Sequence, residues 1–288
     1  MNVAHSVAEL GHADRAVAIG TFDGVHIGHR RVLEAVVAAG LTPTVVTFWP
    51  HPRTVLGNRV ELLATLERRL ELLADAGITD TLVVEFTEEV ARLEPHAAAD
   101  SLLRGIGTRV IAVGGNFRFG RAAAGDPELL GDLGFDVRVV PLVDGASSTR
   151  IRQLLRAGDV GAAARLLGRP AEVEGIVVLG DQRGGTLGYP TANLDVPGDL
   201  LVPAYGIYAG AALGHRAAVS IGVNPHYGGA ERRIEPYLLD FDGDLYGRRL
   251  VVELWARLRD ERAFASEQEL VAQIASDVDA TRRAERPF

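Results

Sequence analysis

The sequence contains no cysteine, so it can form neither a disulfide nor a thiolate metal site. It also lacks an excess of positive charge. Asp and Glu number 38 against 30 Lys and Arg, and the formal net charge is −8. This balance argues against broad, nonspecific binding of nucleic acid, but it is compatible with a small basic pocket for phosphate.

Export and membrane signals are absent as well. The stretch "MNVAHSVAELGHADR" has no basic start followed by an apolar core, and no apolar run reaches the length of a membrane span. We therefore expect a soluble, cytoplasmic protein without a signal peptide. The chain shows no tandem repeats and no low-complexity segment.

The first half of the chain alternates short β-branched runs with helical segments. We expect strands over residues 16–20, 43–48, 81–86, 109–114 and 136–141. Helical segments are expected over residues 29–40, 61–77 and 94–107, each of which ends in or near a glycine. This alternation predicts a parallel sheet with helices on both faces, and ligands of such sheets bind beyond the carboxyl ends of the strands.

The pattern changes after Pro170, where strands become short and turns become rich in glycine. Strands are expected over residues 172–179, 206–213, 216–222, 233–241 and 248–258, which is typical of a small antiparallel barrel. A closing helix begins with a capping-box pattern at Ser266 and Glu269. The face formed by Leu270, Ile274 and Val278 should pack on the barrel. With 288 residues, the chain is predicted to form two domains, 1–170 and 171–288.

The stretch "GTFDGVHIGH", residues 20–29, follows the first expected strand and precedes a helix. Its glycines would let the backbone approach a ligand closely, and the unpaired N–H groups at the start of a helix suit phosphate. The histidines His26 and His29 could donate further hydrogen bonds to the same phosphate chain. The alternative is a tight turn that carries two exposed imidazoles, and both interpretations stay open at this point.

Further candidate motifs follow other strands at the same edge. They are "TFWPHPR", "GGNFRFGRAAAGD" and "SSTRIR", the last at residues 147–152. Hydroxyls beside a helix start suit phosphate oxygens, and Arg152 lies one turn further along. Taken singly, "SST" is explained as an N-cap and the two aromatics of "NFRFG" as core residues. Their joint placement favours one enclosed ligand.

Together with "LGYPTANL" (187–194) and "IEPYLLDFDGDLYGRRLVVELWARLR" (234–259), these motifs resemble the bacterial bifunctional riboflavin kinase/FMN adenylyltransferase family, also called FAD synthetase. The resemblance covers nearly the whole chain. It implies a Rossmann-like nucleotidyltransferase domain followed by a riboflavin kinase β-barrel with a terminal helix. It also implies phosphorylation of riboflavin to FMN and adenylylation of FMN to FAD, each with ATP.

The resemblance implies roles for individual residues. Catalysis of adenylyl transfer would involve His26, His29 and Arg152. The wider ATP set would be Gly20, Phe22, Asp23, Gly24, His26, His29, Ser148, Thr149 and Arg152, and the flavin set Pro50, His51, Asn116, Phe117 and Phe119. In the kinase half, the ATP set would be Gly180, Gly188, Pro190, Thr191 and Asn193.

The resemblance further implies that Thr191 and Asn193 bind Mg²⁺ and that Glu235 is the general base on the riboflavin 5′-hydroxyl. Judged without it, Glu235 would be an exposed strand carboxylate beside Arg232 and Arg233. The implied partners are small molecules, ATP, riboflavin and FMN, with no nucleic acid and no membrane; self-association stays open.

Four positions depart from the family pattern. Trp49 stands where Asp is common, Gly145 and Gly185 stand where basic residues are frequent, and Pro236 removes a ladder N–H beside Glu235. Two alternatives therefore stay open. One is a specialised relative with a single activity or another nucleotide or flavin substrate, and the other is a flavin-binding protein without turnover.

Overall fold

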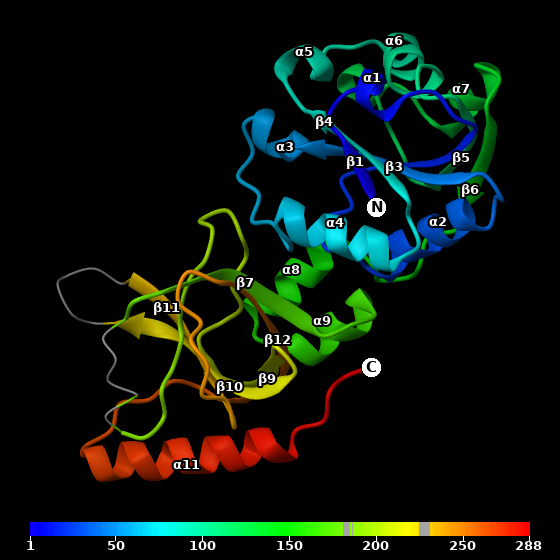
Figure 1. Ribbon diagram of the computed structural model, residues 1–288. Coiled ribbons are helices and arrows are strands. Elements are labelled where there is room, and N and C mark those ends of the chain that lie inside the picture. The colour runs from blue at the N-terminus through cyan, green and yellow to red at the C-terminus, as the bar shows by residue number, and fades with distance from the viewer. Residues whose placement is uncertain (181–184, 186, 225–230) are drawn as a thin grey trace. The chain divides into compact units, whose positions relative to one another are not determined.

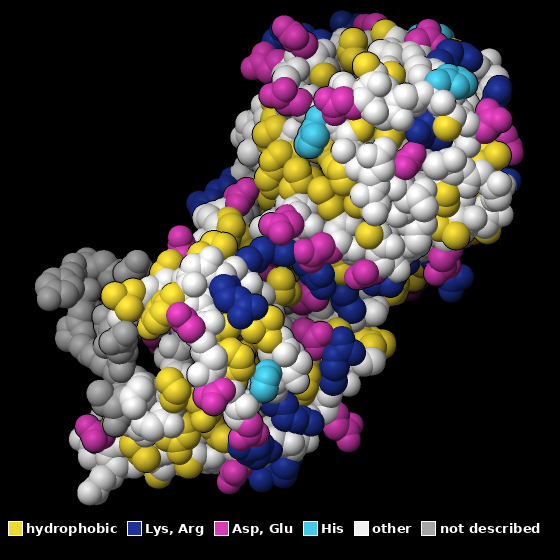
Figure 2. Space-filling model, viewed as in Figure 1, with side chains coloured by type: hydrophobic (Ala, Val, Ile, Leu, Met, Phe, Trp, Pro, Cys, Tyr) yellow, Lys and Arg dark blue, Asp and Glu magenta, His cyan; other side chains and the backbone are white. Residues whose placement is uncertain are grey.

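Two structural units make up the chain in the computed structural model, Met1–Ser148 and Thr149–Phe288 (Figure 1). The structure describes residues 1–180, 185, 187–224 and 231–288. Among these, no helix is both long and apolar enough to cross a membrane. On the face shown in Figure 2, acidic and basic side chains are interspersed over the surface of each unit.

The first unit contains a six-stranded sheet in the order β1-β4-β3-β2-β5-β6, and every pair of neighbouring strands is parallel. The strands are β1 (Asn2–Ala4), β2 (Arg15–Ile19), β3 (Thr42–Trp49), β4 (Asp80–Glu85), β5 (Thr108–Gly114) and β6 (Asp136–Val140). The parallel sheet predicted from the sequence is confirmed, and its five predicted strands are correct to within one residue at either end. Only the short edge strand β1 was not predicted.

Helices cover both faces of this sheet (Figure 1). They are α1 (Val7–Leu10), α2 (Ile27–Val37), α3 (Pro52–Val55), α4 (Leu66–Asp75), α5 (Glu88–Ala91), α6 (Pro95–Ala99) and α7 (Pro127–Asp132). The helix expected over 61–77 begins only at Leu66, because the Thr65 side chain accepts a hydrogen bond from the Arg68 N–H and caps it there. The helix expected over 94–107 is shorter than predicted, since α6 passes into a wider π-helical turn over Asp100–Arg104.

Alternation along the strands builds two apolar layers. Val17 and Ile111 face one layer, whereas Ala18 and Val110 face the other. The strand order reverses at the pair β2 and β5, which is the switch point where ligands of open α/β sheets bind. The loops that carry "GTFDGVHIGH" and "GGNFRFG" follow these two strands.

The second unit contains a six-stranded antiparallel sheet in the order β11-β10-β9-β12-β7-β8. The strands are β7 (Ala171–Val178), β8 (Asn193–Asp195), β9 (Gly206–Ala212), β10 (His215–Asn224), β11 (Glu231–Leu238) and β12 (Arg249–Arg259). The two outer strands approach each other, because the Ala192 N–H donates to the Pro236 carbonyl at 2.9 Å. The sheet therefore nearly closes on itself, and the predicted barrel is confirmed; β8, which is three residues long, was not predicted.

The closing helix α11 (Glu267–Arg283) packs against β9 and β10. Ser266 caps it by accepting from the Glu269 N–H at 3.2 Å, as the sequence predicts. Arg216 of β10 fixes its far end by donating to the carbonyls of Thr281 at 2.8 Å and Ala284 at 2.6 Å. The helix is thus tied to the barrel at its end by charged hydrogen bonds in addition to apolar packing.

Two helices, α8 (Ser148–Arg156) and α9 (Val160–Leu167), precede the barrel. Helix α9 packs on β7 and β12 and buries Val160, Ala163, Ala164 and Leu167. The Ala204 N–H donates to the Leu155 carbonyl at 3.0 Å. The structural division at Ser148 therefore precedes the boundary at residue 170 that the motifs predict, because these helices complete the packing of the second unit.

The packing of α9 gives a prediction about fragments. A fragment of residues 149–288 should unfold cooperatively and be more stable than residues 171–288 by about 3 kcal/mol, since the shorter piece exposes the apolar surface that α9 covers. Urea denaturation followed by circular dichroism measures this difference. Equal midpoints for the two fragments would show that α9 contributes nothing to the stability of the barrel.

Candidate functional site

The turn after β2 has a strained backbone. Phe22 and Val25 have φ angles of 47° and 38°, although neither is glycine and Val25 is β-branched. The Val25 N–H donates to the Phe22 carbonyl at 3.0 Å and closes the turn. Strain of this kind is kept where the surrounding structure enforces it, and it concentrates at functional sites.

The two histidines of this turn stack on each other. Their ring centroids lie 3.7 Å apart at an interplanar angle of 15°, and the Phe22 ring meets His29 edge-on at 5.2 Å. His26 caps α2, because its Nδ1 accepts a hydrogen bond from the His29 N–H at 3.3 Å. With only 6% of its surface exposed, His26 is not the exposed imidazole of the alternative interpretation.

The electrostatic surroundings of His29 favour its neutral form. Burial, and then the nearby His26 and Arg69, hold the pKa of His29 well below its usual range. A neutral imidazole keeps one N–H donor. His29 therefore offers a hydrogen bond to a phosphate oxygen without first carrying a charge of its own.

The start of α8 is tied to the same turn. Ser148 Oγ donates to the Asp23 carbonyl at 2.9 Å, and Asp23 Oδ1 accepts from the Leu63 N–H at 2.9 Å. The structure thus brings His26, His29, Asp23 and Ser148 together within the first unit. Thr149 and Arg152 continue α8 in the second unit, and their places relative to the histidines stay predictions.

The residues predicted to bind flavin in the first unit have mixed surroundings. His51 is buried and caps α3, with its Nδ1 accepting from the Arg53 N–H at 3.1 Å. Phe117 and Phe119 stack at 5.7 Å and pack against the core, while Asn116 and Pro50 are exposed. Helix capping and core packing therefore account for His51 and the two phenylalanines in part, and their contact with flavin stays a prediction.

In the second unit, Gly180 and Asn193 lie against each other. A Cβ at position 180 would overlap the side-chain amide of Asn193. Asn193 begins β8 and pairs with Val178 at the end of β7. Glycine at 180 therefore leaves the room that the Asn193 amide occupies, which explains why this glycine belongs with the "PTAN" motif.

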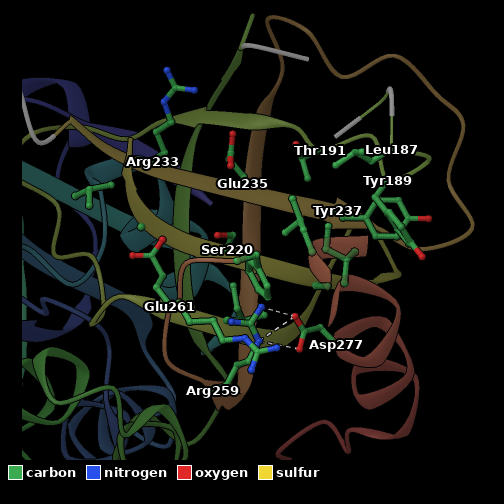
Figure 3. Close-up of a pocket in the computed structure, with 18 residues that line it drawn as sticks. Leu187, Tyr189, Thr191, Ser220, Arg233, Glu235, Tyr237, Arg259, Glu261 and Asp277 are labelled. Atoms are coloured by element: carbon green, nitrogen blue, oxygen red, sulfur yellow. Dashed lines mark hydrogen bonds and ion pairs between the residues drawn. The ribbon is translucent and has the colours of Figure 1, made fainter. Parts of the chain in front are cut away.

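A cavity of about 350 Å³ opens between the barrel and α11 (Figure 3). Thr191, Tyr189 and Glu235 lie at one end of it, and its lining includes apolar side chains such as Phe264 and Ile274. Its volume is in the range of sites for small organic ligands. Leu270 and Ile274, predicted to pack on the barrel, are only partly buried because they line this cavity.

Glu235 lies on β11 and pairs with Ser220 of β10, and both line the cavity. Arg233 lines it as well, two residues earlier on the same face of the strand. Pro236 lies opposite Val219 on an outer strand of the sheet, where proline is tolerated, and its carbonyl still accepts from Ala192. The departure at position 236 therefore leaves the strand, and with it the place of Glu235, intact.

The opposite wall of the cavity contains charged residues that the sequence motifs did not identify. Asp277 of α11 accepts from Arg259 Nε at 3.0 Å and from Nη2 at 2.7 Å (Figure 3). Glu261 lies so close to Gly222 that a Cβ there would overlap its carboxylate. Burial raises the pKa of Glu261, although the Val223 N–H and Arg259 oppose this. The acidic residues after β12 and in α11 could not be recognised without knowing how α11 docks.

A second cavity, of about 390 Å³, lies on the other side of Thr191. Its lining comes from "PTA" at 190–192, from β11, and from the turn over residues 241–246. Thr191 lines both cavities. Ligands in the two cavities would therefore both lie near Thr191, which suits transfer of a group from one ligand to another.

The donor atoms around "PTAN" fit a hard cation held mainly by a nucleotide. Thr191 supplies a hydroxyl oxygen and Asn193 an amide carbonyl oxygen, both of which Mg²⁺ accepts alongside phosphate oxygens and water. The space beside Gly180 accommodates that amide. Within the described residues there is no cluster of three or more His, Asp or Glu side chains that could hold a metal ion without a nucleotide.

Comparisons with known proteins cover both units. Residues 9–152 match the family model described as FAD synthetase, and residues 167–285 match the one described as riboflavin kinase. Bifunctional riboflavin kinase/FMN adenylyltransferase of Listeria monocytogenes is 34% identical over 93% of this chain and 92% of its own length. The Escherichia coli K12 protein of the same name is 35% identical over 95% and 93%.

Among solved structures, a protein from Streptococcus pneumoniae described as a macrolide-efflux protein has a TM-score of 0.89. Its sequence is 30% identical, and the match covers 98% of this chain and 99% of the Streptococcus pneumoniae chain. The order and extent of both units are therefore shared with proteins of known structure and sequence.

The ion pair on the cavity wall gives a prediction. Asp277→Asn should lower the free energy of unfolding by about 2 kcal/mol, because it leaves the partly buried Arg259 without its counter-charge. Asp240→Asn is the matched control, since it breaks an equally bidentate but exposed pair with Arg282 of the same helix and should change little. Thermal or urea unfolding measures the change in the free energy of unfolding for both variants. Equal changes would show that the Asp277 pair stabilises the protein no more than the exposed pair does.

Proposed function

The chain belongs to the family of bifunctional riboflavin kinase/FMN adenylyltransferases, and on that premise we propose which of its residues carry out the two reactions. It phosphorylates riboflavin to FMN with ATP, and it transfers the adenylyl group of a second ATP to FMN, which gives FAD and pyrophosphate. We assign adenylyl transfer to residues 1–170 and riboflavin phosphorylation to residues 171–288.

The observation that supports the kinase assignment best is the position of Thr191 between two cavities. Riboflavin would occupy the cavity between the barrel and α11, whose apolar walls suit a flat ring. ATP would occupy the second cavity, so that its γ-phosphate reaches the region of Thr191. The ribityl 5′-hydroxyl would then lie beside Glu235, which lines the end of the first cavity.

In the phosphoryl transfer, the 5′-oxygen of riboflavin forms a bond to the γ-phosphorus while the bond to the β–γ bridging oxygen breaks, and ADP leaves. Glu235 accepts the proton of the hydroxyl and orients it. Gly180, Gly188 and Pro190 shape the approach to the phosphates. Arg233 lines the same cavity.

Kinases and adenylyltransferases that use ATP typically require a divalent metal, and we propose Mg²⁺ for this chain. Thr191 and Asn193 would hold it. When bound, Mg²⁺ neutralises charge on the phosphate oxygens. The Ala192 N–H, between these two residues, donates to the Pro236 carbonyl and joins this segment to β11.

In the adenylyl transfer, a phosphate oxygen of FMN bonds to the α-phosphorus of ATP while the bond to pyrophosphate breaks. No covalent enzyme intermediate is needed. His26 and His29 would donate to the phosphate oxygens from the start of α2, where the backbone N–H groups add further donors. Gly20, Phe22, Asp23 and Gly24 form the turn that holds them, and Ser148, Thr149 and Arg152 would contact the same phosphate chain from α8.

FMN would be held by Pro50, His51, Asn116, Phe117 and Phe119, on the two loops that follow β3 and β5. Of the departures from the family pattern, Trp49 lies under the guanidinium of Arg69, at 5.5 Å from its ring centroid. Gly145 has a φ angle of 68°, a backbone conformation that favours glycine. Nothing in the described structure explains Gly185. We further propose a cytoplasmic protein that acts on small molecules; self-association stays a prediction.

Incubation of the purified protein with riboflavin, ATP and Mg²⁺, followed by chromatography, tests the proposal as a whole. FMN that appears first and FAD that follows support two activities. A single flavin product would indicate a specialised relative, and bound riboflavin without any product would indicate a flavin-binding protein.

Replacement of a histidine tests the proposed phosphate site. His29→Ala should slow FAD formation by about 10²-fold, since it removes a donor to the reacting phosphates, and should leave FMN formation nearly unchanged. Separate assays with FMN and with riboflavin measure the two rates. Equal loss of both activities would point to a folding role for the turn, and an unchanged rate of FAD formation would rule out a catalytic role for His29.

Replacement of Glu235 tests its proposed role as general base. Glu235→Gln keeps the shape of the side chain but cannot accept the proton, so riboflavin phosphorylation should slow by about 10²–10⁴-fold. Riboflavin and ATP binding should change much less, and FMN adenylylation should not change. A kinase rate within a few-fold of the parent would return Glu235 to a structural role beside its neighbouring arginines.

A further inference from the structure

Arg69 of α4 is the largest side chain that the first unit buries completely, with 0% of its surface exposed. Burial of a guanidinium removes it from water and is unfavourable unless charges or hydrogen bonds compensate. Arginine nevertheless keeps its proton in proteins, so this position carries a permanent positive charge. No motif from the sequence included it.

The partners of Arg69 do not satisfy all of its donors. Its Nη1 donates to the Phe48 carbonyl at 3.3 Å, and its guanidinium lies over the Trp49 ring. Its Nε and Nη2 are buried and have no hydrogen-bond partner within the described residues. Arg15, the other buried arginine of this unit, instead makes four hydrogen bonds through its Nη atoms, one of them to Asp80 at 2.8 Å.

The two arginines also lie at opposite ends of the sheet. Arg15 begins β2, whereas Phe48 and Trp49 end β3, at the carboxyl edge where the turn over residues 20–29 lies. Arg69 interacts electrostatically with Asp23 and with His29 of that turn. Its charge therefore acts on the turn that carries the histidine pair, whereas Arg15 lies at the opposite edge of the sheet.

We propose that Arg69 is a positioning residue of adenylyl transfer, whose buried positive charge beside the end of β3 acts on His29 and favours binding of the polyphosphate to the histidine pair. The inference rests on the proposed role of the two histidines. A fixed charge in a site of low dielectric acts on incoming phosphates more strongly than a surface charge does. The same charge disfavours a second positive charge on His29, so the imidazole stays neutral and keeps its orientation as a donor.

All 30 basic residues of the chain are arginines, because it contains no lysine. The difference matters at position 69. A buried lysine readily loses its proton, whereas arginine does not. Arg69→Lys is therefore an intermediate variant, because it keeps a basic side chain of similar length that loses its proton more readily when buried.

The test compares Arg69→Gln, Arg69→Lys and the control Arg68→Gln in the full-length protein. Arg68 is the neighbouring residue on α4, where it pairs with Glu71 at 2.6 Å in a partly buried ion pair, and its replacement changes the net charge by the same amount. Arg69→Gln should lower kcat/KM for FAD formation by about tenfold to a hundredfold, as loss of a group that supports catalytic side chains commonly does. Arg69→Lys should lose less, Arg68→Gln should stay near the parent, and riboflavin phosphorylation should stay intact in all three.

An NMR titration of the histidine rings gives a second readout: a packing defect would raise the pKa of His29 alike in both Arg69 variants, whereas loss of charge raises it more in Arg69→Gln than in Arg69→Lys. The groups that face His29 are His26 on its own helix and Arg69 from α4, and Asp23 acts through Arg69. In Arg69→Gln, the pKa of His29 should rise toward its ordinary value of 6.5, because one of the charges that lower it is gone. The His29→Ala variant identifies the resonance.

The outcomes separate this inference from the proposed function. If His29→Ala impairs FAD formation but Arg69→Gln behaves like Arg68→Gln, the role of Arg69 is overturned and that of the histidines stands. If Arg69→Gln and Arg69→Lys are equally impaired while the His29 titration is unchanged, Arg69 acts by shape alone and the proposal fails. If His29→Ala has no effect, the failure belongs to the proposed site itself.

Discussion

The kinase half of the molecule depends on one backbone hydrogen bond, from the Ala192 N–H to the Pro236 carbonyl, which joins the two outer strands of the second sheet. It places the "PTAN" segment beside β11, so that Thr191 and Glu235 come from opposite edges of the sheet to the end of one cavity. Without this closure, β8 would be an unsupported three-residue strand, and the two cavities would not share a wall. The proline beside the base is compatible with this closure because only its carbonyl takes part in the bond.

The adenylyltransferase half relies on a different constraint, a strained turn held from several sides. Ser148 Oγ donates to the backbone carbonyl of Asp23, and the Leu63 N–H donates to the Asp23 carboxylate. Phe22 packs edge-on against His29. Such over-determination can hold positive φ angles at Phe22 and Val25, and it keeps the stacked imidazoles at the start of α2. The buried charge of Arg69 contributes further by helping to keep His29 in its neutral form.

Much of the fold could be predicted from the sequence, because β-branched runs and glycine stops have clear periodicity. Strands β2 to β6 of the parallel sheet are examples, since each was predicted to within one residue at either end. The sequence could not predict where packing overrides local pattern: β8 is too short to leave a signal, α6 widens into a π-turn, and α9 belongs with the barrel although it precedes the boundary at residue 170. The site shows the same limit. Motifs pointed to His26, Thr191 and Glu235, whereas Arg69, Arg259 and Asp277 needed the tertiary structure, since their partners lie on other elements.

The proposed kinase mechanism requires riboflavin and ATP to occupy the two cavities that meet at Thr191. A crystal structure with riboflavin, Mg²⁺ and a non-hydrolysable ATP analogue tests it most directly. We expect the flavin ring between the barrel and α11, the nucleotide in the cavity bordered by residues 241–246, and the 5′-hydroxyl about 3 Å from the Glu235 carboxylate. A flavin bound elsewhere, or Glu235 turned away from the hydroxyl in that complex, would contradict it.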